Sequence, residues 1–329
     1  MAPNPQVRGL RPGSRPLARR GLRWPSYRDR VSTPEAVPVT PGSLADVLAL
    51  LAGHRLTVLT GAGVSTDSGI PDYRGPDSPP RTPMTFQQFV GDEAFRRHYW
   101  ARNHVGWRHV NRTVPNGGHR ALAELEHRGV VVGVITQNVD LLHEAAGSHN
   151  VIDLHGRYDR VVCLRCRHVV PRAALAHRLE ALNPGFVERV GQVGDVEIAP
   201  DADAVIEQTA DFRVQACWQA DPDGLLPECG GILKPDIVYF GETVPKERVE
   251  RAYAMVDAGD ALLVAGSSLT VQSGLRFVRH AATTGKPVVV VNRGATRGDR
   301  YAALTVDAGT TETLTDLAAL LPPPRHPAP

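Results

Sequence analysis

The sequence predicts an α/β protein with a doubly wound parallel sheet and a smaller inserted domain. Two patterns predict the sheet. Short apolar runs rich in β-branched residues alternate with helical segments, and polar or glycine-rich turns follow the runs. Four cysteines grouped between two such runs predict the inserted domain. With 329 residues and 42% hydrophobic content, the chain can bury a core large enough for both parts.

The first forty residues are interpreted as a disordered tail. They are rich in proline, glycine and arginine and show no periodicity. Residues 1–30 hold eight arginines and one acid. Because the whole chain has a net charge of only +2, residues 31–329 are mildly acidic. An arginine-rich start is also typical of transit peptides, but its prolines disfavour the amphipathic helix that such a signal needs. We therefore expect a cytoplasmic protein, with no nucleic-acid-binding surface and no membrane span.

Regular structure begins at Ser43. Residues 43–51 predict an amphipathic helix with a serine cap, and Gly53 ends it. The apolar run 56–59 predicts a buried parallel strand. Residues 76–116 are irregular to helical. Further helices are predicted over 118–129, 246–257 and 275–284, and further strands over 130–136, 150–154, 260–265 and 287–291.

A glycine turn follows the first strand. Gly61 and Gly63 allow a tight turn in which the backbone can approach a ligand without a Cβ in the way. Ser65, Thr66 and Ser68 can cap a following helix, and such a helix start suits a pyrophosphate. The spacing departs from G-x-G-x-x-G, so the glycines alone leave nucleotide binding and an ordinary turn equally open.

Polar residues follow the later strands as well. Thr136-Gln-Asn-Val-Asp140 follows the second strand, and His155 follows the run 150–154. A turn of small residues that starts at Gly266 follows the strand 260–265, and a turn that starts with the amide residue Asn292 follows the strand 287–291. Each turn has a structural explanation, because Asn138 or Asp140 can cap a helix and a lone histidine is usually structural. Together they predict a ligand site, since such sheets bind ligands at the carboxyl ends of their strands.

These motifs in this order resemble the sirtuins, the NAD-dependent protein deacylases. The chain supplies GAGxSxxxGIPD-aromatic-R from Gly61 to Arg74, then TQNxDxLH, HG, four cysteines, KPxxVxFGE and GSSLxV, over roughly residues 43–321. Tyr73 stands at the usual Phe. Residues 99–107 and 292–297 look most like the class II branch. The Tyr-and-Arg pair of that branch's desuccinylases is not evident between Gly75 and Arg108.

The resemblance implies a Rossmann-like NAD-binding domain over 41–156 and 234–329, with a helical insertion at about 76–116. A small zinc-binding domain would occupy 157–233. It also implies that NAD, a co-substrate, contacts Gly61, Ala62, Gly63, Ser65, Asp72, Tyr73, Arg74, Gln137, Asn138, Asp140, Gly266, Ser267, Ser268, Asn292, Arg293, Gly294 and Ala308. Val238 and Phe240 would border the acyl-lysine tunnel.

The four cysteines, Cys163, Cys166, Cys217 and Cys229, predict one structural zinc ion. The first pair has the spacing of a zinc knuckle, whereas eleven residues separate the second pair instead of two to four. We interpret residues 218–228 as a turn looped out between two ligands. Two unmetallated thiol pairs are the alternative, and disulfides are not expected in a cytoplasmic protein. Four thiolates leave no open position on zinc, so the ion would support the fold only.

The reaction that the resemblance implies transfers an acyl group from lysine to ADP-ribose. The amide oxygen attacks the ribose, nicotinamide leaves, and a base must then deprotonate a ribose hydroxyl so that it attacks the O-alkylimidate. His155 stands at the family's position for this base, and a histidine suits the task at neutral pH. Asn138 would orient the ribose and a water, and Ile70 would help to form the nicotinamide pocket.

Three functions remain open from the sequence. The leading one is an NAD-dependent deacetylase acting on acyl-lysine proteins. The second keeps NAD but removes longer acyl chains or transfers ADP-ribose to protein. The third is a non-catalytic NAD-binding or ADP-ribose-binding module. His155 beside an intact Thr136–Asp140 motif argues against the third function, because binding alone needs no base there.

Overall fold

The computed structural model describes residues 41–73, 83–191, 203–207 and 209–324. The expected tail, residues 1–40, and Arg74 lie outside the described residues, as does the start of the expected helical insertion. The chain divides into two units, Met1–Ala36 and Val37–Pro329, and the structure below is that of the second unit. None of its described helices is both long and apolar enough to cross a bilayer.

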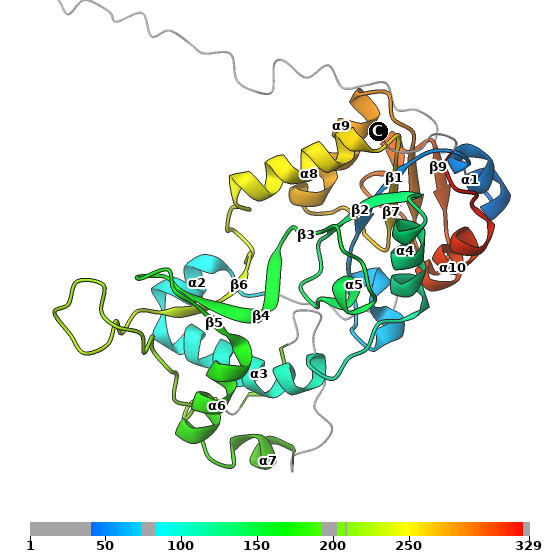
Figure 1. The fold of residues 1–329 in the computed structure, drawn as a ribbon. Coiled ribbons are helices and arrows are strands. Elements are labelled where there is room, and N and C mark those ends of the chain that lie inside the picture. The colour runs from blue at the N-terminus through cyan, green and yellow to red at the C-terminus, as the bar shows by residue number, and fades with distance from the viewer. Residues whose placement is uncertain (1–40, 74–82, 192–202, 208, 325–329) are drawn as a thin grey trace, which may run out of the picture. The chain divides into compact units, whose positions relative to one another are not determined.

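Within the described residues, six parallel strands form the large sheet, in the order β3-β2-β1-β7-β8-β9 (Figure 1). The strands are β1 (Leu56–Thr60), β2 (Val131–Thr136), β3 (Val151–Asp153), β7 (Ala261–Ala265), β8 (Val288–Val291) and β9 (Leu304–Val306). Strands β1, β7 and β8 are buried along their whole length, as their continuous β-branched and aliphatic runs require. The predicted fold class is confirmed.

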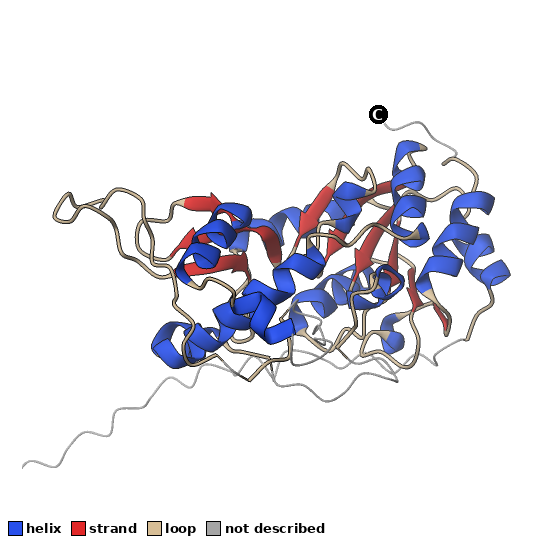
Figure 2. Cartoon of the chain, turned by 90° about the horizontal axis from the view of Figure 1, so that it is seen from below, coloured by secondary structure: helices blue, strands red, loops and turns tan. Residues whose placement is uncertain are grey.

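Helices cover both faces of this sheet, and Figure 2 shows them on either side of the strands. One core cluster joins the sheet to α1 (Leu44–Leu51), α4 (Gly117–His127) and α10 (Thr310–Leu320). A second cluster joins the other face to α8 (Lys246–Ala258) and α9 (Gln272–Thr283). Ser43 caps α1 in a capping box with Asp46, as its sequence predicted. The short α5 (Leu142–Ala145) follows β2.

A second, antiparallel sheet lies in the inserted part of the chain. Its order is β5-β4-β6, with β4 (Gly156–Cys163) between β5 (Val169–Pro171) and β6 (Leu233–Ile237). A third core cluster joins it to α2 (Phe86–Gly91), α3 (Glu93–Val110), α6 (Arg172–Leu182) and α7 (Phe186–Gly191). The insertion before α4 and the cysteine segment therefore share one core, while the expected domain boundaries stay a prediction.

The helix expected directly after the glycine turn does not form. Two short 3-10 turns, η2 (Ala62–Val64) and η3 (Thr66–Ser68), take its place, and neither has a side-chain cap. The Ser65 hydroxyl bonds instead to side chains that follow β2. A side-chain partner elsewhere in the fold thus outcompetes the local cap that the sequence predicted.

Strands β1 and β7 mark the point where the strand order of the large sheet reverses. The chain runs outward from β1 to β2 and β3 on one side, and β7, β8 and β9 lie on the other side. The carboxyl ends of β1 and β7 are Thr60 and Ala265, which pair in register. Because ligands bind at such a switch point, the residues after these two strands position the site.

Candidate active site

A cavity of about 460 Å³ opens at the switch point. This volume is within the range of small-molecule sites. The expected site residues on its wall are Gly61, Ala62, Gly63, Ser65, Asp72, Tyr73, Gln137, Asn138, Asp140, His155, Val238, Phe240, Gly266, Ser267, Ser268, Asn292 and Arg293. Ile70 also lines it. Gly294 and Ala308 do not lie on the wall, and Arg74 is outside the described residues.

The glycines of the first turn let two loops touch through their backbones. The N–H of Gly63 donates to the carbonyl of Gly266 at 2.9 Å. A Cβ at Gly61 would lie 2.8 Å from that same carbonyl oxygen, and one at Gly63 would lie 2.9 Å from the Cα of Gly266. Gly266 itself has φ +63°, which favours glycine. The glycines are therefore required for the contact between two loops of the cavity wall, a role that the sequence did not reveal.

Ser65 organises the polar end of the cavity. It is fully buried, and its hydroxyl donates to Oδ2 of Asp140 at 2.7 Å while it accepts from Nδ2 of Asn138 at 3.0 Å. Asp140 also accepts from the N–H of Leu142 at 3.0 Å, so it holds a backbone amide at the start of α5 as well as the Ser65 hydroxyl. Burial raises the pKa of Asp140, although these hydrogen bonds oppose the rise.

Two buried histidines lie behind this pocket. Nε2 of His119 is 3.5 Å from the Ser65 hydroxyl, and Nε2 of His143 is 2.9 Å from the hydroxyl of Thr60. The two rings lie 4.8 Å apart. Burial lowers the pKa of His119 to about 4 and that of His143 well below the ordinary value. Both rings are therefore neutral at pH 7 and support the pocket without adding charge.

His155 lies where the chain passes from the large sheet to the small one, between β3 and β4. Its carbonyl accepts from the N–H of Val238 at 2.7 Å. The next residue, Gly156, has φ +92°, and a Cβ there would lie 2.0 Å from the carbonyl oxygen of Asp236 in β6. Only glycine allows this approach, so the His-Gly pair has a physical basis: the glycine lets β6 hold the histidine in the cavity.

The imidazole of His155 is held in one tautomer. Its Nδ1 is 2.9 Å from the carbonyl oxygen of Gln137, which can only accept, so Nδ1 carries the proton. Nε2 faces the hydroxyl of Ser273 at 2.8 Å. Burial lowers the pKa of His155 to about 4, with a further contribution from Arg248, while the Gln137 contact opposes it. His155 is thus a neutral imidazole whose Nε2 lone pair lies in the cavity.

The side chain of Gln137 is also fixed. Its Oε1 accepts from the Ser267 hydroxyl at 2.5 Å, which links the turn after β2 to the turn after β7. A Cβ at Gly274 would lie 2.6 Å from Nε2 of Gln137. The absence of a side chain at Gly274 therefore lets the start of α9 pack directly against Gln137.

The segment after β6 forms the opposite wall. Val238 and Phe240 line the cavity, and the ring of Phe240 meets Tyr73 edge-on, with 6.3 Å between centroids. Lys234, which is 4% exposed, donates to Glu242 at 3.0 Å and holds the ends of this segment together. The Glu242 side chain is 23% exposed, so this partly buried ion pair joins β6 to the end of the segment.

The turn after β8 closes the far end of the cavity. The side-chain amide of Asn292 donates to the carbonyls of Arg293 and Gly294 at 2.8 and 2.9 Å. Gly294 in turn donates to Asp307 at 3.1 Å. Asn292 thus shapes the turn through its amide group.

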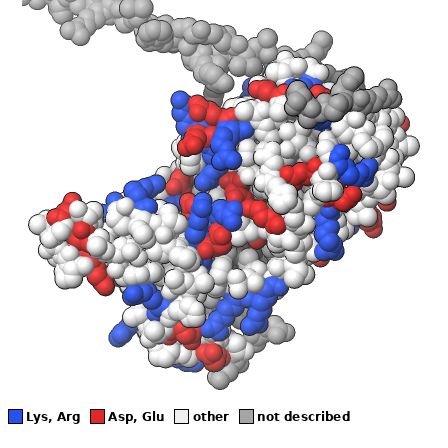
Figure 3. All heavy atoms as spheres, in the orientation of Figure 1, with Lys and Arg blue, Asp and Glu red and all other residues white. Residues whose placement is uncertain are grey.

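On the face seen in Figure 3, acidic and basic side chains are interleaved over the described residues.

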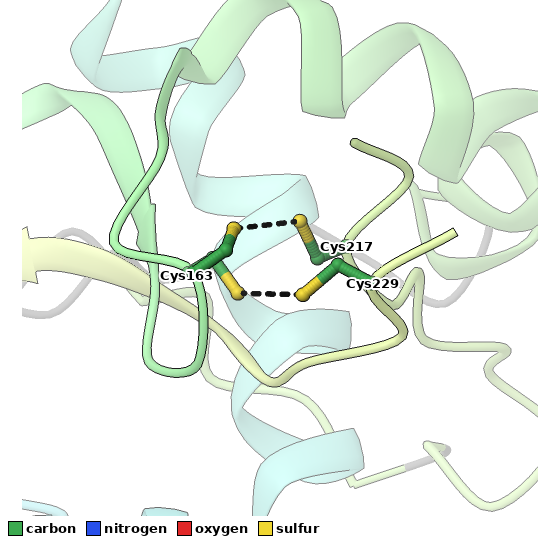
Figure 4. A group of neighbouring side chains, drawn as sticks. Cys163, Cys217 and Cys229 are labelled. Carbon is green, nitrogen blue, oxygen red and sulfur yellow. Dashed lines mark hydrogen bonds between the residues drawn. The ribbon is translucent and has the colours of Figure 1, made fainter. Parts of the chain in front are cut away.

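The four cysteines converge outside this cavity (Figure 4). Their sulfur atoms all lie within 4.8 Å of one another, and the Cys163–Cys229 and Cys166–Cys217 pairs are both 3.7 Å apart. Tetrahedral zinc with bonds of about 2.3 Å needs sulfurs about 3.8 Å apart, so the group fits the ion. A Cβ at Gly231 would lie 2.6 Å from Sγ of Cys163, so glycine keeps this space open.

The widened second spacing is accommodated by a looped-out segment, residues 218–228. The chain closes at its base, where Cys217 donates to the carbonyl of Gly231 and Gly230 donates back to Cys217, both at 2.9 Å. Asp221 accepts from two backbone N–H groups inside the loop and pairs with Arg165 at 2.9 Å. The extra residues therefore form a loop closed at its base, and both cysteines lie within the four-sulfur group.

Comparison with known proteins identifies the family. Residues 61–273 match the model of the Sir2 family. The chain belongs to the Sir2 family. A protein of Mycobacterium avium (strain 104) named NAD-dependent protein deacetylase 1 is 63% identical over 282 residues, which cover 85% of this chain and 97% of that protein. Its namesake in Streptomyces coelicolor is 49% identical over 297 residues, covering 88% and 95%.

Solved structures agree with this assignment. A structure titled as a Sir2 homolog–NAD complex superposes with a TM-score of 0.63 at 29% identity, covering 85% of this chain and 94% of that one. A structure titled Sir2-p53 peptide-NAD+ gives a TM-score of 0.59 at 29% identity, covering 84% and 98%. The sirtuin resemblance found in the sequence is confirmed.

The sequence missed several wall residues of this Sir2 family protein. Ser273, Tyr158 and Ile237 line the cavity, and His119 contacts Ser65 from behind. Ile237 stands at a variable position of the KPxxVxFGE motif, and the other three residues belong to none of the motifs quoted above. A weak signal for Ser273 was available, since it lies between the GSSLxV motif and the predicted helix 275–284.

Proposed function

We propose that this protein is an NAD-dependent protein-lysine deacetylase. The observation that carries the proposal is His155, a neutral imidazole of fixed tautomer whose Nε2 faces a cavity at the switch point of the sheet. The polar wall residues and the cavity volume suit a dinucleotide. The names of the relatives from Mycobacterium avium and Streptomyces coelicolor support the same activity.

NAD, when bound, supplies a ribose carbon that accepts the acyl oxygen and a nicotinamide that leaves. The buried network of Ser65, Asn138 and Asp140 would hold the nicotinamide and its ribose, with Ile70 beside them. The remaining expected cofactor contacts at the turns after β1, β2, β7 and β8 would hold the rest of the molecule. Gly294 and Ala308, which do not line the cavity, and Arg74, which lies outside the described residues, stay predictions.

His155 would accept the proton of a ribose hydroxyl at Nε2. Because burial lowers its pKa to about 4, the ring is unprotonated at neutral pH and its lone pair is present. The carbonyl of Gln137 keeps the proton on Nδ1 and would stabilise the ring once Nε2 is also protonated.

The substrate would be an acyl-lysine segment of a protein. We propose that its backbone adds as a strand between residues 234–241 and the loop 267–272, with the acyl-lysine between Val238 and Phe240. The cysteine cluster would bind one structural zinc ion, with no role in the chemistry. Zinc-binding thiolates need a reducing compartment, and so we propose a cytoplasmic location.

A second candidate function, removal of longer acyl chains, has one observation in its favour. The cavity wall also includes Val110, Val139, Tyr158 and Ile237, which belong to a separate apolar cluster. Such a wall favours hydrocarbon over charged acyl groups.

The test combines NAD with acetyl-lysine and longer acyl-lysine peptides and follows nicotinamide release and peptide mass, for wild type and His155→Ala. We expect wild type to remove the acetyl group. The rate of acetyl loss should be at least ~100-fold lower in the variant, since general-base catalysis contributes about 10²–10⁴-fold. An intact acetyl peptide with cleavage of longer chains would favour the second candidate. A protein that gains ADP-ribose mass would indicate ADP-ribosyl transfer, and no NAD consumption would leave only a binding module.

A further inference from the structure

Ser273 meets the imidazole of His155 inside the cavity. Its Oγ lies 2.8 Å from Nε2 of His155, and both residues line the cavity wall. Ser273 is the second residue of α9 (Gln272–Thr283). Nε2 is the atom that would take the ribose proton, so the contact is made at the reacting end of the ring.

The direction of this hydrogen bond follows from the other side of the ring. Nδ1 of His155 carries the proton, because it faces the carbonyl oxygen of Gln137 at 2.9 Å. A neutral imidazole has only one N–H, so Nε2 can only accept. The Ser273 hydroxyl therefore donates to Nε2.

Packing of α9 against Gln137 places the hydroxyl there. A Cβ at Gly274 would lie 2.6 Å from Nε2 and 2.9 Å from Cδ of Gln137, so only a residue without a side chain lets the helix start so close. The same Gln137 orients His155 through its carbonyl and is itself held by Ser267 at 2.5 Å. Ser273 and Gln137 thus fix the imidazole from both nitrogens.

We propose that Ser273 is a positioning residue for His155 in the proposed deacetylation, on which this inference rests. Before reaction its hydroxyl donates to Nε2 and holds the ring in place. The Ser273 hydroxyl then rotates about its Cβ–Oγ bond, which frees the Nε2 lone pair for the proton of the ribose hydroxyl, and the Ser273 oxygen accepts from the new N–H. Ser273 keeps its own proton throughout, and one proton moves from ribose to His155.

The surroundings make such an acceptor valuable. The guanidinium of Arg248 acts on His155 and donates to the carbonyl of the preceding Leu154 at 3.3 Å. The amino end of α9 also carries positive partial charge. An imidazolium next to these groups in a partly buried site is costly, and a hydroxyl oxygen that accepts its proton lowers that cost. If the Ser273 hydroxyl only blocked the lone pair of Nε2, it would lower the rate of deacetylation.

The experiment compares wild type, Ser273→Ala, Ser273→Thr and Thr283→Val in two assays with NAD and an acetyl-lysine peptide. Thr283 is the matched control, because it carries a hydroxyl at the other end of α9 that bonds only to helix carbonyls among the described residues. The first assay is deacetylation, and the second is exchange of labelled nicotinamide into NAD. Nicotinamide departure needs no proton transfer to His155, so exchange reports binding and the first stage alone.

For Ser273→Ala we expect a fall of ~10- to 100-fold in the kcat of deacetylation, the loss expected for one hydrogen bond to a group that becomes charged. Nicotinamide exchange and the KM for NAD should stay within about twofold of wild type. Ser273→Thr should restore most of the rate, and Thr283→Val should match wild type. Thermal unfolding of each variant checks that the fold is retained.

Equal loss of exchange and deacetylation in Ser273→Ala would overturn the inference, as would an unchanged or increased rate. Failure of the threonine to restore the rate would also count against it. Wild-type protein that shows neither activity would refute the proposed function itself, whereas active wild type with an insensitive Ser273→Ala variant would refute this inference alone.

Discussion

At the scale of single residues, Ser65 supports two other residues of the proposed site through one buried hydroxyl. It is fully buried and is hydrogen-bonded to both Asp140 and Asn138. Replacing it with alanine leaves a buried carboxyl group and a buried amide each one partner short. The pocket proposed for nicotinamide would lose its internal support, so effects on stability and on NAD use should appear together.

We expect Ser65→Ala to lower the free energy of unfolding by ~1–3 kcal/mol, the cost of unsatisfied buried partners. In the same variant, kcat/KM for NAD should fall ~10- to 100-fold. Urea unfolding and NAD titrations measure the two effects. Ser68→Ala is the matched control on the same turn, because the Ser68 hydroxyl has no hydrogen-bond partner in the described structure. Equal effects in the two variants would contradict the role given to Ser65.

The sequence predicted those residues of the candidate site that follow a strand closely. Asn138, Asp140 and His155 could be identified as candidates because the carboxyl ends of parallel strands meet at one edge. Ser273 had only the weak signal of its place after the GSSLxV motif, because its partner His155 is 118 positions away and only the packing of α9 brings the two together. The helix predicted after the glycine turn was wrong for a similar reason, since Ser65 bonds to side chains that are far away in the sequence.

At the scale of elements, the loop 218–228 is structurally separate from the cysteine group, although it lies between Cys217 and Cys229 in the sequence. None of its residues lines the cavity, and the cysteine positions are set by backbone pairing at the base of the loop. Trp218 packs under Arg178, with 4.3 Å from the guanidinium carbon to the ring centroid. Deleting residues 220–228 would keep that contact and give the ordinary two-residue spacing Cys217-Trp-Gln-Cys229.

This deletion variant should retain one zinc ion per chain and deacetylation within about twofold of wild type, because four thiolates at knuckle spacing still form a closed site. Cys229→Ser, by contrast, should lose the metal and unfold at lower temperature. Elemental analysis and thermal unfolding distinguish the two variants. Loss of zinc in the deletion variant would show that the loop itself shapes the site.

The large sheet was predictable because its central strands are continuous apolar runs between helices. Strand β9 is only three residues long and half-buried, so its composition gave no signal. The small sheet was also missed, because β5 has three residues and alternates between exposed and buried positions. Such elements form through tertiary contacts, here with β8 and β4, which a single sequence does not show.

At the scale of the whole molecule, buried neutral histidines make stability depend on pH. Burial lowers the pKa of His104, His119 and His155 to about 4, and that of His143 well below its ordinary value. An imidazole with a lowered folded pKa contributes stability above the unfolded value of ~6.5, and this stability is lost as pH falls toward the folded value. Asp140 and Asp153 act oppositely, because burial raises the pKa of both, that of Asp153 to about 6, but the four imidazoles outnumber the two carboxyl groups.

The free energy of unfolding should therefore fall continuously from pH 6.5 to about 4.5. Urea titrations at half-unit steps measure it, with zinc content followed in parallel so that metal release is separated from protonation of the histidines. His119→Gln, which cannot gain this charge, should flatten part of the slope. Stability that is constant or rises between pH 6.5 and 5 would contradict the assignment of neutral buried rings.

The most direct test of the proposed function is to follow the acyl group itself. A peptide with an isotopically labelled acetyl-lysine is incubated with NAD, and the soluble products are measured by mass. We expect one nicotinamide released per acetyl group lost, with the labelled acetyl group on ADP-ribose. Labelled free acetate as the direct product, formed without nicotinamide release, would show simple hydrolysis and contradict the roles assigned to His155 and the NAD loops.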